Sequence, residues 1–137
     1  MKKSTRITLS LLYSFLLAAV VVGCSKKEEF AADASVNVQA QIAALQGQDK
    51  TAVQNACAEL GKAGPNAAPA IKYLIPLLKD EDDLTRRLAA WVLCRIGPAA
   101  KEALPALEPL RNDPDRIVAQ QAESALKAID PAKYGTN

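Results

Sequence analysis

The sequence predicts an all-α protein, a short α-solenoid built from about three helical hairpins. The first observation is a repeat: residues 64–96 align with residues 97–129 at 12 of 33 positions, where an alanine-rich composition gives roughly three or four identities by chance. The second is helical spacing of apolar residues within each copy, and the third is a glycine-proline pair at the start of each copy. Together they predict stacked pairs of helices.

Each copy contains two helical segments separated by an acidic turn. In the first copy, apolar residues recur three or four positions apart in two runs, as helices with one buried face require. They are Ala67, Ala70, Ile71, Leu74, Leu77 and Leu78, then Leu88, Ala89, Val92, Leu93 and Ile96. The turns at 80–83 and 112–115 are rich in Asp and Asn, which favour the N-terminus of a following helix.

Glycine and proline mark the boundaries between copies. Gly64-Pro65 and Gly97-Pro98 are typical of a helix that ends at glycine and another that begins just beyond. Small Ala89 and its counterpart in the next copy let successive second helices lie close together. A single hairpin cannot bury its apolar face alone, so we expect stacking to form the core.

A less regular copy precedes these two. Its helices are predicted from Val38, Ile42 and Leu45, and from Val53, Ala56, Leu60 and Ala63. The weak apolar content of this pair suits the terminal unit of a stack. At the other end, Asp130-Pro131 is expected to stop the last helix.

The repeated residues resemble those of the HEAT family, and more narrowly the short HEAT-like repeats of phycobilisome lyases, over residues 38–130. They are Ala70, Leu74, Leu77, Asp80, Arg86, Ala89, Leu93, Ile96 and Gly97, repeated as Ala103, Leu107, Leu110, Asp113, Ala122, Leu126 and Ile129. The resemblance implies a helical-repeat fold and says little about function. The chain departs from the pattern at Val53 and Ala119, which stand where Arg86 stands, so a ladder of acids and arginines would be incomplete.

The N-terminus predicts export and lipid attachment. Residues 1–6 are basic, residues 7–23 carry no charge, and Cys24 follows Gly23, which together are typical of a secretory leader. Cysteine at that edge resembles the lipobox of bacterial lipoproteins, in which cleavage precedes Cys24 and the lipid attaches to it. The alternative is an uncleaved anchor that spans the membrane.

The expected organisation is a cleaved leader at 1–23, a lipidated tether at 24–36, a repeat domain at 37–130 and a tail at 131–137. The prediction places the domain in the bacterial cell envelope, facing the periplasm. Ser25 after the lipid cysteine resembles the outer-membrane class, so we expect the outer membrane. More than one acyl chain is needed for lasting attachment.

Composition argues against several functions. Without the leader's three basic residues, 14 of the 17 basic residues remain against 15 acidic ones, so no electrostatic case exists for nucleic acid. The chain has no histidine, which removes histidine metal sites and the commonest general base. The acidic turns lack the spacing and glycine of a calcium loop. We expect no metal, cofactor, catalytic residue or small-molecule substrate.

Two cysteines outside the leader form one candidate site. Cys57 aligns with Ala90, and Cys94 lies one turn beyond Ala90 on the neighbouring second helix. The third copy has Glu123 and Lys127 at these places, which predicts partial exposure of both thiols. An oxidising compartment favours a disulfide, whereas the usual spacing of helix axes makes the bridge strained. A Cys57–Cys94 disulfide and two free thiols are both left open.

A second candidate site is a stripe on the second helix of the middle unit. Arg87, Trp91 and Arg95 are four residues apart, and Trp and Arg are enriched at binding hot spots. The alternative is that Trp91 packs at a repeat junction while the arginines face water. Arg86 is expected to be structural, paired with Asp82 or Asp115.

These features predict a non-catalytic, membrane-tethered interaction or scaffold module whose partner is an unidentified envelope protein. A short surface of three units would gain from co-localisation at the membrane. A structural spacer is one alternative. A cysteine-dependent enzyme or a chromophore-handling protein, as the lyase resemblance implies, is the other, and it would have to use Cys57 or Cys94.

Overall fold

The computed structural model describes residues 36–135; the leader, Cys24 and most of the tether lie outside this range. The α-helices are α1 (Val38–Leu45), α2 (Lys50–Ala63), α3 (Ile71–Leu77), α4 (Asp83–Ile96), α5 (Leu104–Leu107), α6 (Arg116–Ile129) and α7 (Pro131–Tyr134). Three 3₁₀ segments adjoin them: η2 (Gly64–Ala70), η3 (Gly97–Ala103) and η4 (Glu108–Asn112). No helix between residues 36 and 135 is long and apolar enough to cross a membrane.

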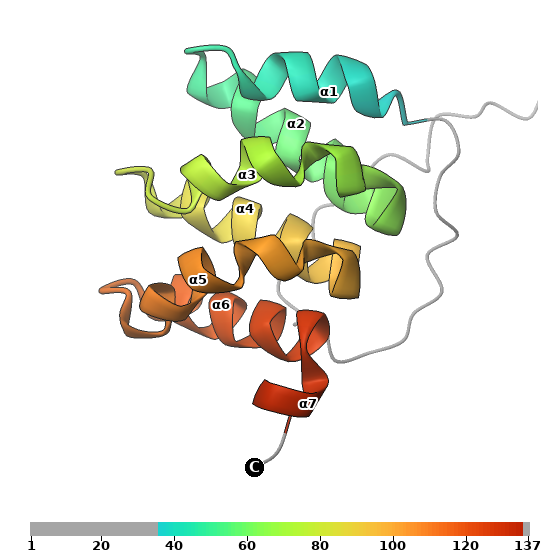
Figure 1. The fold of residues 1–137 in the computed structure, drawn as a ribbon. Helices are drawn as coiled ribbons and strands as arrows, with labels where there is room; N and C mark the ends of the chain where they lie inside the picture. Colours follow the sequence, from blue (N-terminus) through green and yellow to red (C-terminus); the bar gives the residue numbers. More distant parts are fainter. Residues whose placement is uncertain (1–35, 136–137) are drawn as a thin grey trace, which may run out of the picture.

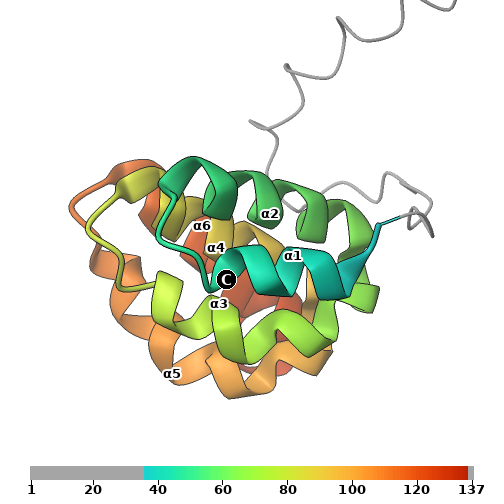
Figure 2. The same ribbon diagram turned by 90° about the horizontal axis from the view of Figure 1, so that it is seen from above.

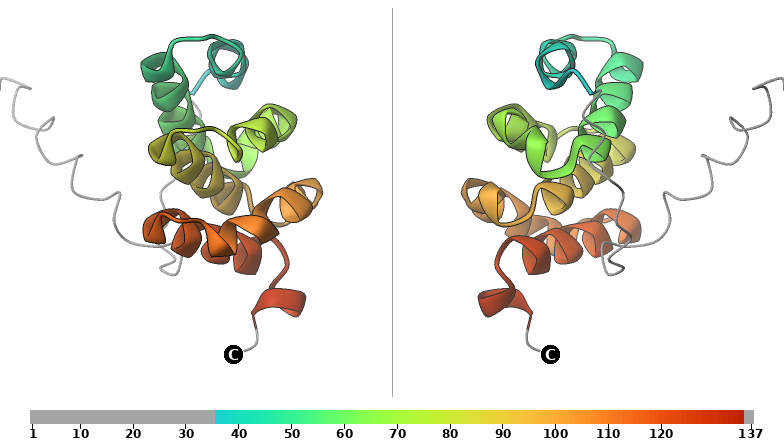
Figure 3. Two further views of the ribbon diagram at one scale, coloured as in Figure 1. Left: turned by 90° about the vertical axis from the view of Figure 1, so that its left-hand side faces the viewer. Right: turned by 90° about the vertical axis from the view of Figure 1, so that its right-hand side faces the viewer.

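The helices form a stack of three hairpins in two layers (Figure 1). Seen along the stack, α2, α4 and α6 lie in one column, while α1, α3 and α5 lie in the other (Figure 2). Figure 3 shows the hairpins following one another from the N-terminal to the C-terminal unit. Helix α4 packs against α2 on one side and α6 on the other. The prediction of a short all-α solenoid is confirmed.

The first helix of the second and third units is not one continuous α-helix, contrary to the sequence prediction. Each unit instead begins with a 3₁₀ segment, and the third also ends its first helix in η4. Prolines occur throughout this layer: Pro65, Pro69, Pro76, Pro98, Pro105 and Pro109. A proline lacks the backbone N–H and clashes with the preceding turn, and short 3₁₀ pieces accommodate such interruptions.

The second helices begin and end as predicted. Asp49, Asp82 and Asp115, which are 33 residues apart, are the N-caps of α2, α4 and α6, and each carboxylate accepts hydrogen bonds from backbone N–H groups of the first turn. Gly64 and Gly97 end α2 and α4 with φ of +56° and +73°. These positive values suit glycine, because a side chain is strained there.

The core lies between the two layers and is made of leucine and alanine. The large, fully buried residues include Leu60, Leu74, Leu93, Leu107 and Leu126. Both predicted small contact residues, Ala89 of α4 and Ala122 of α6, are fully buried as well. Small residues between α4 and α6 allow the close approach that the repeat pattern predicted.

The units are also joined by polar contacts at the turns. Arg86 of α4 binds Asp113 of the following turn through two hydrogen bonds, Nε to Oδ2 at 2.9 Å and Nη2 to Oδ1 at 3.0 Å. Its Nη1 donates to two backbone carbonyls of its own turn. Neither Asp82 nor Asp115, the acids that the sequence suggested as examples, is its hydrogen-bond partner; each is the N-cap of the helix that follows it. The earlier junction uses Gln54, whose amide donates to Asp82 at 3.0 Å.

The hydrogen bonds between Arg86 and Asp113 stabilise both charged forms. They hold the pKa of the Asp113 carboxyl below its ordinary value and raise the pKa of the Arg86 guanidinium. At the end of the stack, α7 turns back toward the last unit. Lys133 pairs with Glu108 at 2.8 Å, and the Tyr134 hydroxyl donates to the same carboxylate.

Candidate interaction surfaces

The predicted stripe on α4 is built against α2. The Trp91 ring lies directly over Gly61, so close that a Cβ atom at Gly61 would stand 1.8 Å from ring atom Cζ3. The ring is therefore seated at the junction of the first and second units, and it stays partly exposed. Packing at a repeat junction, one of the two alternatives for Trp91, is thus observed.

The two arginines flank this ring and are also partly exposed. Arg95 Nε donates to the Gly61 carbonyl at 3.3 Å, which ties the C-terminal end of the stripe to α2. Arg87 Nε is buried and has no hydrogen-bond partner within the described part of the chain. The stripe thus presents one partly exposed aromatic ring and two partly exposed cations.

Replacing Gly61 with alanine tests the seat of the ring. On helix propensity alone, alanine would stabilise α2 by about 1 kcal/mol. Here the new methyl group meets the Trp91 ring, and overpacking of this kind costs about 1 to 3 kcal/mol. We expect a net loss of stability and a red shift in the fluorescence of the single tryptophan. Replacing exposed Asn55 of α2 with alanine is the matched control and should change neither fluorescence nor stability by much.

The structure bears on both expectations for the cysteines. Cys57 is a free thiol, so a Cys57–Cys94 disulfide, one of the two alternatives left open by the sequence, is not formed. Both side chains are buried rather than partly exposed. The prediction took Glu123 and Lys127 of the third copy as a guide, but that copy is the last layer within the described residues. Helix α2, which contains Cys57, has a further hairpin packed against it.

Burial raises the pKa of the Cys57 thiol to about 12. We therefore expect this thiol to resist alkylation at neutral pH in the folded protein and to react fully in denaturant, as peptide mapping would show. Because the folded-state pKa is raised, its contribution to stability is present below the unfolded pKa and is lost as pH rises. The free energy of unfolding should fall above about pH 9. Rapid labelling of native Cys57 would contradict this.

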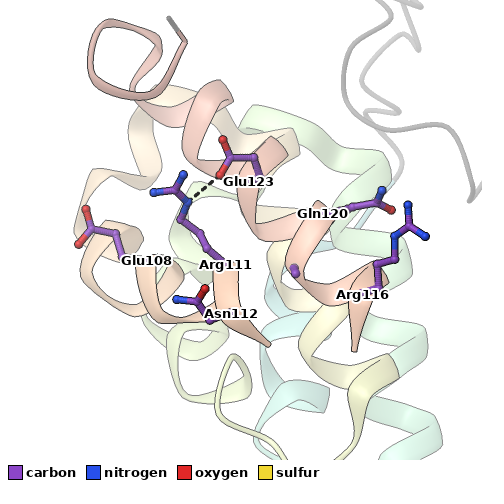
Figure 4. A pocket seen from close by; sticks show the side chains of 7 residues that line it. Glu108, Arg111, Asn112, Arg116, Gln120 and Glu123 are labelled. Carbon is purple, nitrogen blue, oxygen red and sulfur yellow. Dashed lines mark hydrogen bonds and ion pairs between the residues drawn. The ribbon is translucent and has the colours of Figure 1, made fainter. Parts of the chain in front are cut away.

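A further surface feature was not predicted from the sequence. An open pocket of about 770 Å³ lies on the outer side of the third unit, between η4 and α6 (Figure 4). We call it the end pocket, and its lining residues are Glu108, Arg111, Asn112, Arg116, Ala119, Gln120 and Glu123. Arg111 and Glu123 pair across it at 2.7 Å.

The repeat register contained a signal for the end pocket. Arg111 and Glu123 align with Leu78 and Ala90 of the second unit, both of which are buried. When a buried apolar position of one copy becomes charged in the next copy, the change indicates that this surface of the later copy is exposed. The residues of 36–135 contain no cluster of His, Cys, Asp and Glu that could hold a metal ion.

The stacked hairpins and the surfaces they expose define a helical-repeat protein. Comparison with protein families matches HEAT repeats over residues 38–127. The chain belongs to the HEAT-repeat family. No curated protein matches the sequence.

Solved structures agree on the fold. Sixteen chains match, among them the crystal structure of an engineered protein from the Northeast Structural Genomics Consortium, with a TM-score of 0.62 and 22% identity. The match covers 69% of this chain and 45% of that protein, so the chain spans less than half of its length. At this identity the likeness concerns the fold alone.

Proposed function

We propose that this protein is a non-catalytic protein-protein interaction module and that it binds its partner through the face of the second helices. HEAT repeats generally mediate such interactions, which supports the coarse assignment. The observation that carries the proposal is the stripe Arg87, Trp91 and Arg95 on α4. A partly exposed Trp ring beside two arginines is the composition of a binding hot spot.

The geometry of the stripe favours binding over a purely structural role. Trp91 is fixed on Gly61, so little side-chain entropy is lost when a partner covers the exposed edge of the ring. Arg87 and Arg95 are partly exposed, so their guanidinium groups can donate charge-assisted hydrogen bonds to acceptors of a partner.

We also propose that the domain is tethered to the envelope membrane through lipid on Cys24. The support is the sequence of residues 1–24: a basic start, an uncharged apolar stretch and a cysteine after Gly23. Mass spectrometry of the protein from its native cells tests this. The expected product begins at Cys24 and carries acyl chains, and Cys24→Ser should release the domain from the membrane fraction. An unacylated chain that retains Met1 would contradict the proposal.

A role as a cysteine-dependent enzyme has less support. The thiolate is the reactive form of cysteine, and the pKa of about 12 leaves Cys57 almost entirely protonated at neutral pH. Its side chain is also fully buried. An assay for alkylation of Cys57 in the native protein, as described above, separates this alternative from the binding proposal.

The binding proposal is tested by crosslinking in intact cells followed by purification. The double substitution Arg87→Ala and Arg95→Ala, and separately Trp91→Ala, should each reduce recovery of the specific partner at least severalfold. Lys72→Ala and Lys101→Ala on the other layer, both exposed, are the matched controls and should leave recovery unchanged. Thermal melts of each variant show that the fold persists. Unchanged partner recovery in both stripe variants would count against this surface.

A further inference from the structure

The end pocket occupies a defined place in the repeat register. In the second unit, which the third unit packs against, two of the positions that correspond to the pocket are buried, Leu78 and Ala90, whereas Lys79 and Asp83 remain exposed. In the third unit the two buried positions are Arg111 and Glu123, paired with each other. The pocket therefore lies on the surface against which a following unit would pack. In the last described unit this surface carries charged residues in place of apolar ones.

The corresponding surface of the second unit shows which group of the next unit packs there. There, Arg86 of α4 binds the carboxylate of Asp113, which belongs to the turn of the next layer, with two hydrogen bonds. Ala119 stands at the position of Arg86 in the third unit and lines the end pocket. The end pocket thus lies where the acidic turn of a further unit would pack. The arginine that binds this turn at the preceding junction, Arg86, is replaced by Ala119.

The charges that line the end pocket are not equally satisfied. Glu123 pairs with Arg111 and Lys127, and Glu108 pairs with Lys133 and Tyr134. Both acids of the pocket are therefore occupied. What the pocket has left to offer an incoming group is positive charge and hydrogen-bond donors.

Arg116 supplies that charge. It has no ion pair with any residue of the described range, and the Gln120 side chain has no hydrogen bond there. The two side chains are four residues apart, which places them on one face of α6, and Figure 4 shows them next to each other. Arg116 also lies one turn before Ala119, which stands at the position of Arg86. The third unit therefore has a cation one helical turn from the position that Arg86 occupies in the second unit.

From this arrangement we propose that the end pocket binds an acidic turn of a protein partner. A carboxylate of that turn accepts hydrogen bonds from the Arg116 guanidinium and the Gln120 amide, in the manner in which Asp113 accepts from Arg86. Charge-assisted bonds between arginine and carboxylate are among the strong ones. This binding does not depend on the α4 stripe, which lies on a different unit.

The partner is a protein other than a second copy of this chain. Stacking end to end would bring the first unit of the second copy onto the end pocket. The turn of that unit has Gly47 at the place of Asp80 and Asp113, so it lacks the required carboxylate. Its acidic residue, Asp49, aligns with Asp82 and Asp115 rather than with Asp113, the aspartate that Arg86 binds.

The test uses the full chain, labelled for NMR, and a capped synthetic peptide with the sequence of residues 110–115, Leu-Arg-Asn-Asp-Pro-Asp. This peptide carries the aspartate that fills the equivalent place in the preceding unit. We expect saturable shifts at Arg116, Ala119 and Gln120. Arg116→Gln should weaken binding at least tenfold. Lys101→Gln, which removes an exposed cation outside the pocket, should leave it unchanged.

Three results would overturn the proposal. They are the absence of saturable shifts at α6, equal binding by Arg116→Gln and the parent protein, and equal binding of a peptide whose aspartates are replaced by asparagine. Sedimentation equilibrium supplies a fourth, since a dimer that Arg116→Gln dissociates would make a second copy the occupant. The double variant Arg87→Ala and Arg95→Ala should bind the peptide as the parent protein does. The peptide test therefore remains valid even if the α4 stripe proves not to bind a partner.

Discussion

Replacing Leu93 with alanine is expected to lower the free energy of unfolding by about 2 to 5 kcal/mol. Leu93 is fully buried in α4, the helix that contacts both α2 and α6. Its loss removes buried apolar surface and leaves a cavity in the core. Because a domain of this size is stabilised by only about 5 to 15 kcal/mol in total, the variant should be close to unfolding at physiological temperature.

Urea denaturation followed by circular dichroism measures this effect. Ile117→Ala is the matched control, because Ile117 is a large apolar residue of α6 that is 51% exposed. Surface substitutions of this kind stay within about 0.5 kcal/mol. Equal effects at the two positions would mean that Leu93 does not lie at the centre of the stack.

Replacing Arg86 with alanine is expected to lower stability by about 3 to 5 kcal/mol. The side chains of Arg86 and Asp113 are only 13% and 4% exposed, so the substitution leaves the Asp113 charge buried without its partner. It also removes the donors to two carbonyls of the preceding turn. Most of the expected loss comes from leaving the Asp113 carboxylate buried without a cation, and less of it comes from the lost attraction between the two charges.

The matched control for this prediction is Arg111→Ala. Arg111 also pairs with a carboxylate, but it is 50% exposed and its partner Glu123 is 33% exposed. Solvent screens such a pair, so its removal should cost less than about 1 kcal/mol. Similar losses in both variants would contradict the distinction between a buried and an exposed pair.

The pair between Arg86 and Asp113 also predicts a pH dependence. The folded-state pKa of Asp113 is lowered by the hydrogen bonds from Arg86, so its stabilising contribution is present above the unfolded pKa of about 4. That contribution is lost as pH falls through the folded-state value. The parent protein should therefore lose more stability than Arg86→Ala between about pH 5 and pH 2, and parallel curves would argue against the pair.

The layout of the fold could be predicted because its signals are local and repeated. Gly97 needs a positive φ, and Asp82 and Asp115 cap helices that begin next to them in sequence. The 3₁₀ segments were missed although the prolines that cause them were visible. The partner of Arg86 was also missed, because the sequence pattern does not show which of the two aspartates in the next turn faces the arginine, and that aspartate is Asp113.

The surfaces were harder to predict because exposure depends on which layer comes next. Glu123 and Lys127 led to the inference that Cys57 and Cys94 are exposed, but those polar residues report the end of the stack. The same reasoning explains the end pocket: Arg111 is charged where Leu78 is buried. The seat of Trp91 on Gly61 requires knowledge of how two helices face each other, which spacing within one helix does not supply.

The joint between the second and third units has a consequence for engineering. Asp80 occupies the same register as Asp113, so a duplicate of residues 64–96 inserted after Ile96 would bring its own anchor for Arg86 and its own arginine for the layer beyond. The first unit and the last described unit would keep repeat copies as their neighbours. Residues 64–96 therefore form a repeat unit that can be duplicated to lengthen the exposed surface by one hairpin at a time.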